Sequence, residues 1–179
     1  MNEQEALTIA QTLRDSGKSL ADVAGTLYDN GMGLGIDQVV RILCSGLDLD
    51  ANHIAQALYD KDGLNLDADQ VAKALYRSRC LELSADGVAE VLYRPGGLDL
   101  EEMEVAHALH SLDLNDTQVA QILYGENGLN LNAKQVAQAL YDKEGLDLTA
   151  QYIAWILCEE LGLDADYVHQ ILVEIGITA

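Results

Sequence analysis

The sequence predicts an all-α protein: a right-handed α-solenoid of about eleven short antiparallel helices, stacked as helical hairpins in one superhelical domain over residues 1–179. Two observations predict this fold class. A Val or Ile followed four positions later by Leu recurs along the whole chain, and this is the apolar face of an amphipathic helix. Helix-capping residues recur at a constant distance before that Val or Ile. Helices joined by such short linkers pair as antiparallel hairpins, and repeated hairpins stack as solenoids.

Each repeat unit contains an anchor, which is the Val or Ile that opens its apolar face. The anchors are Ile9, Val23, Val39, Ile54, Val71, Val88, Val105, Val119, Val136, Ile153 and Val168. Leu stands four positions after every anchor, and a small residue follows most anchors directly. One helix of roughly three turns is therefore expected around each anchor.

The helix starts and stops have signals of their own. Eight units carry a good N-cap four positions before the anchor: Ser19, Asp50, Asp67, Ser84, Asn115, Asn132, Thr149 and Asp164. Three units add a Gln that can complete a capping box: Gln70, Gln118 and Gln135. Four linkers carry a Gly four positions after a Tyr: Gly63, Gly97, Gly128 and Gly145. This spacing predicts a Schellman turn, with Tyr at C3 and Gly at C′.

Charge limits the classes of partner. Thirty acidic residues face ten basic ones, giving a formal net charge of −20. Such a chain repels phosphate backbones and anionic lipid, so neither direct nucleic-acid binding nor membrane binding is expected. No apolar run approaches the length of a membrane span and the N-terminus lacks a signal-peptide pattern, so a cytoplasmic location is expected. Cys44, Cys80 and Cys158 lie far apart in the sequence, which indicates neither a disulfide framework nor a zinc site.

Two further patterns are interpreted as structural. Tyr recurs five positions after the anchor in units followed by a long linker: Tyr28, Tyr59, Tyr76, Tyr93, Tyr124 and Tyr141. Because Tyr is present only where the linker is long, we expect it to pack the linker. The Asp-rich linkers fail the calcium-loop pattern, since position twelve from Asp60 is Val71 instead of Glu. Glu104, His107 and His110 are too few to hold a metal ion without a further ligand, so no metal site and no cofactor are predicted.

The last two units depart from the repeat in a way that indicates a contact surface. Tyr152, Trp155 and Tyr167 occupy positions where other units mostly carry polar residues. Exposed aromatic side chains favour a partner site or a homodimer through the C-terminal helices. The alternative interpretation is that the terminal helix folds back and covers them. Glu101, Glu102 and Glu104 are a second, weaker choice of partner-binding residues.

The predicted function is a non-enzymatic protein-interaction module, an acidic scaffold that binds a basic protein or peptide. No catalytic triad, phosphate loop or dinucleotide fingerprint is present in the sequence, so an enzyme is not expected. One alternative is a DNA mimic that inhibits a nucleic-acid-binding protein, since rows of carboxylates can imitate phosphate spacing. A second alternative is a structural subunit that self-associates.

Overall fold

A computed structural model describes residues 3–29 and 33–177, so residues 1–2, 30–32 and 178–179 of the predicted domain lie outside the described part. That part is all-helical, as predicted. Its helices are α1 (Glu3–Asp15), α2 (Leu20–Asp29), α3 (Ile36–Arg41), α4 (Ala51–Tyr59), α5 (Ala68–Arg77), α6 (Ala85–Tyr93), α7 (Glu102–His110), α8 (Asp116–Tyr124), α9 (Ala133–Tyr141), α10 (Ala150–Trp155) and α11 (Ala165–Glu174). Two π-helical turns, η1 (Ile42–Gly46) and η2 (Ile156–Glu160), extend α3 and α10 directly.

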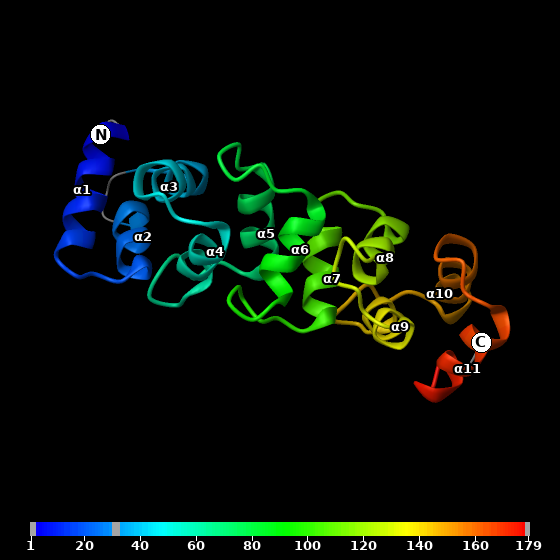
Figure 1. The fold of residues 1–179 in the computed structure, drawn as a ribbon. Coiled ribbons are helices and arrows are strands. Elements are labelled where there is room, and N and C mark those ends of the chain that lie inside the picture. The colour runs from blue at the N-terminus through cyan, green and yellow to red at the C-terminus, as the bar shows by residue number, and fades with distance from the viewer. Residues whose placement is uncertain (1–2, 30–32, 178–179) are drawn as a thin grey trace.

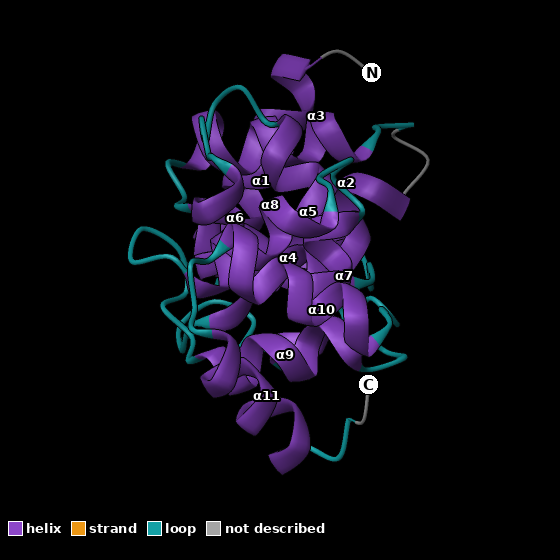
Figure 2. Cartoon of the chain, turned by 90° about the vertical axis from the view of Figure 1, so that its right-hand side faces the viewer, coloured by secondary structure: helices purple, strands orange, loops and turns teal. Residues whose placement is uncertain are grey.

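The helices follow one another in a row, with α1 at one end of the molecule and α11 at the other (Figure 1). Each helix packs against the helices one and two places along the chain, for example α7 against α5, α6, α8 and α9. Seen along the row, helices fill the centre and linkers lie at the periphery (Figure 2). This arrangement is consistent with the predicted solenoid.

The core consists of the predicted apolar faces. Every anchor from Val23 to Val168 is buried, as is the Leu four positions after it. The first unit differs in register, because Ala6 and Ala10 are fully buried whereas Ile9 and Leu13 are only half-buried. In the described residues no polar or charged side chain is buried. The terminal unit packs on one side only, and this lets its helix rotate its small residues inward.

The predicted helix starts are confirmed. The side chain of each of the eight predicted N-caps accepts a hydrogen bond from a backbone N–H in the first turn, as Asp67 does from Gln70 N at 2.8 Å. All three predicted capping boxes are present, with Gln70, Gln118 and Gln135 accepting from the backbone N–H of their caps. Local sequence therefore determines where these helices begin.

The predicted helix ends are wrong. Helix α4 stops at Tyr59, and Asp60 is already extended, with φ −57° and ψ 138°. Gly63 does not adopt the left-handed conformation that a Schellman turn requires. Its Cα instead lies so close to the helix that an added Cβ would collide with the carbonyl oxygen of Ala57. The same collision with a helix carbonyl would occur at Gly97, Gly128 and Gly145. Glycine is needed there for close approach of two backbone segments, not for its φ angle.

Each linker has a left-handed residue two positions before the next N-cap, and the α6–α7 linker has a second one at Gly96. Positive φ occurs at this position in every linker: Gly17, Gly33, Asp48, Asn65, Glu82, Asp99, Asp113, Asn130, Asp147 and Gly162. The following residue is Leu in most linkers, and its N–H returns to the preceding helix, as Leu66 N does to Leu58 O at 3.0 Å. Asp and Asn tolerate this conformation better than other side chains, which explains much of the acidic content of the linkers.

Candidate protein-interaction surface

Two of the predicted contact residues, Tyr152 and Trp155, form a stacked aromatic pair on α10. Their ring centroids are 5.7 Å apart and their planes differ by 10°. The N-cap Thr149 orients this turn by accepting from Tyr152 N, and the spacing of three residues places both rings on one side of the helix. Tyr152 is 39% exposed and Trp155 is 45% exposed. The rings therefore shield one another, but together they present a broad apolar face to solvent.

Tyr167, the third predicted aromatic residue, lies on the adjacent helix α11 and is 49% exposed. We call Tyr152, Trp155 and Tyr167 the C-terminal aromatic surface. Helix α11 packs against α10 but leaves these side chains open, so the interpretation that it covers them is wrong.

Negative charge surrounds the C-terminal aromatic surface in the sequence. Four exposed acids lie on η2 and at the start of α11: Glu159, Glu160, Asp164 and Asp166. No Lys or Arg follows Lys143 in the chain. Lys134 reaches this region from α9, where its Nζ lies 3.6 Å from Glu174 Oε2. The aromatic rings thus belong to a part of the molecule with a strong excess of carboxylates.

The predicted acidic residues Glu101, Glu102 and Glu104 have contacts inside the fold. Glu101 is the N-cap of α7, and its backbone N–H donates to Glu104 Oε2 at 3.2 Å. Glu102 is half-buried and accepts a hydrogen bond from Gln135 Nε2 at 2.6 Å. Two of the three carboxylates therefore stabilise α7 or hold it to α9, and their role in binding a partner stays a prediction.

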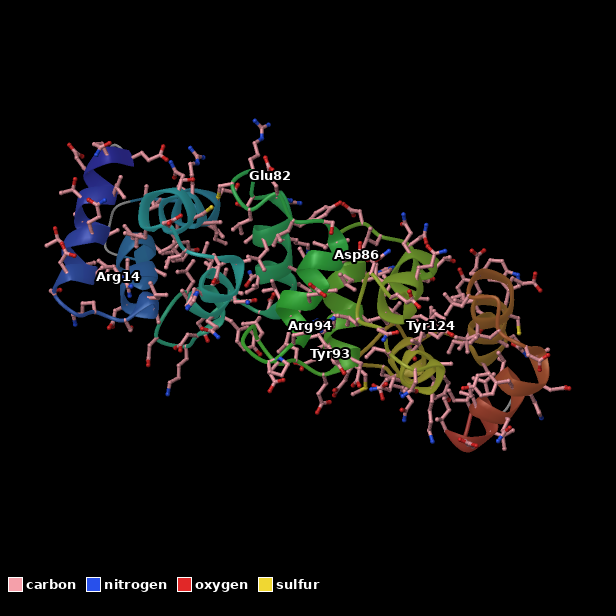
Figure 3. The ribbon with its side chains drawn as sticks, in the orientation of Figure 1. Arg14, Glu82, Asp86, Tyr93, Arg94 and Tyr124 are labelled. Atoms are coloured by element: carbon pink, nitrogen blue, oxygen red, sulfur yellow. The ribbon has the colours of Figure 1, made fainter. Side chains whose placement is uncertain are left out.

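Glu102 also lies next to Tyr93 of α6. Burial raises the pKa of Tyr93, and the Glu102 carboxylate raises it further by its charge and its hydrogen bond. Tyr93 and Arg94 lie at the end of α6 opposite to Asp86 and Glu82 (Figure 3). Tyr93, Glu102 and Gln135 thus connect α6, α7 and α9, which is a different role from the linker packing that we predict for the repeated Tyr.

The other repeated tyrosines are more exposed than that prediction implies. Tyr124 packs against the core as Tyr93 does. The remaining four are 38 to 46% exposed: Tyr28, Tyr59, Tyr76 and Tyr141. Tyr59 lines a shallow cavity with residues of its own linker, such as Asp60 and Asp67. Packing of the linker therefore covers only part of these rings.

The residue two positions after the anchor has a role that the sequence did not indicate. Gln56 donates from Nε2 to the carbonyl oxygen of Gly96 at 3.0 Å, in the linker two units further along. His107 contacts the equivalent linker through Nδ1 and Gly145 O at 3.2 Å. In the second unit this position is Gly25, and the linker comes closer there. An added Cβ on Gly25 would lie 3.1 Å from Gly63 O. This position joins units that are neighbours in space and distant in sequence, so no local pattern reveals it.

The histidines of α7 are engaged in separate contacts. His107 Nε2 lies 3.6 Å from Asp69 Oδ2, and His110 Nε2 lies 3.3 Å from Asp116 Oδ1. Over residues 3–29 and 33–177, no three His, Cys, Asp or Glu side chains are grouped so that they could hold a metal ion.

The structure brings together two cysteines that lie far apart in the sequence. Cys44 lies on η1 and Cys80 lies in the linker between α5 and α6. Cys80 lines a cavity with Ser45, the residue that follows Cys44, and the Ser78 hydroxyl oxygen lies 3.0 Å from Cys80 Sγ. Burial first, and then Cys80, raise the pKa of Cys44 to about 11. A cavity of about 520 Å³ opens beside Cys80; it is lined by Asp37, Val40, Arg41, Ser45, Ala74, Ser78, Arg79 and Cys80.

Comparison of the chain with protein-family models, curated proteins and solved structures finds no match. Among the helices described, none has both the length and the apolar character needed to cross a membrane.

Proposed function

We propose that the chain is a non-enzymatic protein-interaction module whose C-terminal aromatic surface binds a basic segment of a partner protein or peptide. The observation that carries this proposal is the solvent-exposed stack of Tyr152 on Trp155. This stack lies in a stretch of chain that contains carboxylates and, beyond Lys143, no Lys or Arg. A flat aromatic face amid negative charge attracts cationic side chains in particular.

Arginine is the basic residue that suits this surface best. Its planar guanidinium stacks on an aromatic face, and the indole ring of Trp attracts cations most strongly. Exposed acids such as Glu159 and Glu160 on η2 would add longer-range attraction. Each exposed cation–π contact contributes only about 0.5–1 kcal/mol, so we expect a segment with several basic residues and a salt-sensitive affinity.

The first test uses Trp155 itself as the probe. It is the only Trp in the chain, so intrinsic fluorescence reports directly on the proposed site. A peptide with several Arg is expected to change this fluorescence at low salt, and the same peptide with Glu in place of Arg is expected to leave it unchanged. About 0.3 M NaCl is expected to weaken the binding because it screens the charges.

Variants then distinguish binding at this surface from general electrostatic attraction to the acidic chain. Trp155→Ala and Tyr152→Ala are each expected to weaken the peptide's affinity by about 2- to 5-fold, measured by the anisotropy of a labelled peptide. Tyr76→Ala is the matched control, because Tyr76 is 42% exposed and lies on α5, far from α10 in the row (Figure 1). Equal affinity in all three variants would contradict the proposal.

Self-association is a second candidate function, favoured by the exposure of Val173. This residue lies on α11 with Tyr167 and is 55% exposed. A second copy of the chain could cover this apolar area. A homodimer predicts a doubled mass in light scattering at high concentration, and Val173→Ser and Tyr167→Ala should both lower that mass.

The DNA-mimic alternative has less support. Many carboxylates have local uses, as N-caps such as Asp67 or as left-handed linker residues such as Asp99. A DNA mimic needs a row of further carboxylates on one outward face, apart from those that cap helices or form the linkers. It predicts that the chain competes with DNA for a DNA-binding protein, which a gel-shift competition would detect.

A further inference from the structure

Cys44 and Cys80 are two cysteines that the fold brings near one another. Cys44 lies on the π-helical turn η1, and Cys80 lies in the linker between α5 and α6. Cys80 lines a cavity with Ser45, the residue that follows Cys44, and Cys80 also raises the pKa of Cys44. Both cysteines are half-buried. Cys158 lies on η2, toward the other end of the row of helices.

The repeat explains why these two thiols meet. Cys44 stands five positions after its anchor, where other units carry Tyr, and Cys80 stands nine positions after its anchor, where other units carry the linker Gly. Their units are two apart in the chain, and α3 packs against α5. This is the same relation that joins Gln56 to the linker at Gly96. The approach of Cys44 to Cys80 therefore follows from the packing of units two apart in the chain.

Solvent reaches this thiol pair from one side. Cys80 lines the cavity of about 520 Å³, together with Ser78, Arg41 and Arg79. Cys44 does not line it. A small polar oxidant such as hydrogen peroxide would therefore meet the Cys80 sulfur first.

We propose that Cys44 and Cys80 form an oxidisable dithiol, which hydrogen peroxide converts into a disulfide between η1 and the α5–α6 linker. The Cys80 thiolate attacks one peroxide oxygen and the O–O bond breaks, giving the sulfenic acid and hydroxide. The Cys44 sulfur then attacks the Cys80 sulfur, and the hydroxyl leaves as water with the Cys44 proton. Overall, two thiols are oxidised and one peroxide is reduced to two waters.

The disulfide would cross-link two units that otherwise associate only by packing. It closes a loop of about 35 residues, which restricts the unfolded chain. We expect the melting temperature of the oxidised protein to rise by roughly 5–10 °C relative to the reduced protein. Oxidation would thus stiffen the N-terminal half of the row and leave the C-terminal aromatic surface unchanged.

The test is intact-mass spectrometry of the full chain after reduction and brief exposure to hydrogen peroxide. The expected result is a loss of about 2 Da, reversed by a thiol reductant, with one thiol left to alkylate. Cys158→Ser should lose the same mass, and peptide mapping should join Cys44 to Cys80. Cys80→Ser should show no loss, provided that its circular dichroism matches that of the wild type.

Two results would overturn the proposal. One is a mass gain in steps of about 16 Da without the 2 Da loss, which would mean that the thiols oxidise separately. The other is a cross-link that requires Cys158, since that would place the reactive pair elsewhere or between molecules.

Discussion

Four linkers contain a glycine whose Cα lies against a carbonyl oxygen of the preceding helix, as Gly128 lies against Ile122. Two residues later the chain turns through a left-handed residue, which is Asn130 in this linker. The glycine is therefore needed for lack of a side chain, and the Asn or Asp for tolerance of positive φ. One linker thus has two separate requirements, close approach at the glycine and positive φ at the Asn or Asp.

Gly128→Ala should destabilise the protein, because the added Cβ would collide with Ile122 O and the linker would have to move. We expect a loss of about 1–3 kcal/mol in the free energy of unfolding, measured by urea denaturation. Gly35→Ala is the control, since an added Cβ there meets nothing within 4 Å. A similar loss in both variants would show that close approach is not the reason for the glycine.

Glu82→Gly should stabilise the protein. Glu82 has φ +48° and, among the linker residues that the structure describes, is the only left-handed one that is not Gly, Asn or Asp. Relief of this strain is expected to add about 0.5–1 kcal/mol to the free energy of unfolding, measured in the same way. Glu82→Ala removes the same carboxylate without relieving the backbone, so a gain of equal size in that variant would point to charge instead.

Individual helices begin where capping side chains replace the missing hydrogen-bond partners of the first turn. Asp50 illustrates this, since its Oδ1 accepts from His53 N at 3.0 Å and contacts His53 Nδ1 at 2.8 Å. The backbone hydrogen bond from His53 is the largest cause of a pKa for Asp50 below its usual value of 3.8. The ionised form is thus favoured more in the folded protein than in the unfolded chain.

The N-cap at Asp50 should make the stability of the protein depend on pH in the acidic range. Because the folded pKa is lowered, its contribution is present above the unfolded pKa and is lost as pH falls through the folded pKa. Asp50→Asn keeps an accepting oxygen but cannot titrate. Between about pH 5 and pH 2.5 the melting temperature of the wild type should fall further than that of Asp50→Asn. Parallel curves would mean that this carboxylate contributes nothing to acid sensitivity.

Across the whole molecule, helices pack against neighbours one and two places away while carboxylates accumulate on the outside. Only a few ion pairs relieve this charge in the described part; one example is Arg41 with Glu3 at 3.3 Å. With a net charge of −20, repulsion among the acids opposes the folded state.

Added salt should therefore stabilise the protein at pH 7. Raising NaCl from about 10 mM to 0.5 M should increase the melting temperature by several degrees, because the screening length falls well below the spacing of distant charges. KCl and MgCl₂ should act equally at equal ionic strength. A larger effect of Mg²⁺ would indicate specific cation binding, which the grouping of side chains over the described residues does not suggest.

The sequence alone predicts the helical class, the buried face of every unit after the first, and the starts of the helices that carry a predicted N-cap. Those features depend on residues within one turn of each other, such as Asp67 with Gln70 or Val71 with Leu75. It also singled out Tyr152 and Trp155, although their stacking and exposure come from the structure. The helix ends were predicted wrongly because several turn geometries share the same glycine spacing.

Which distant residues meet depends on how the helices pack in three dimensions. The hydrogen bond of Gln56 to Gly96 and the contact of His107 with Gly145 each join units two apart in the chain. The same packing brings Cys44 near Cys80. Such contacts depend on the rotation and spacing of stacked helices. Side-chain packing sets that geometry over the whole row, and a local pattern of residues does not contain it.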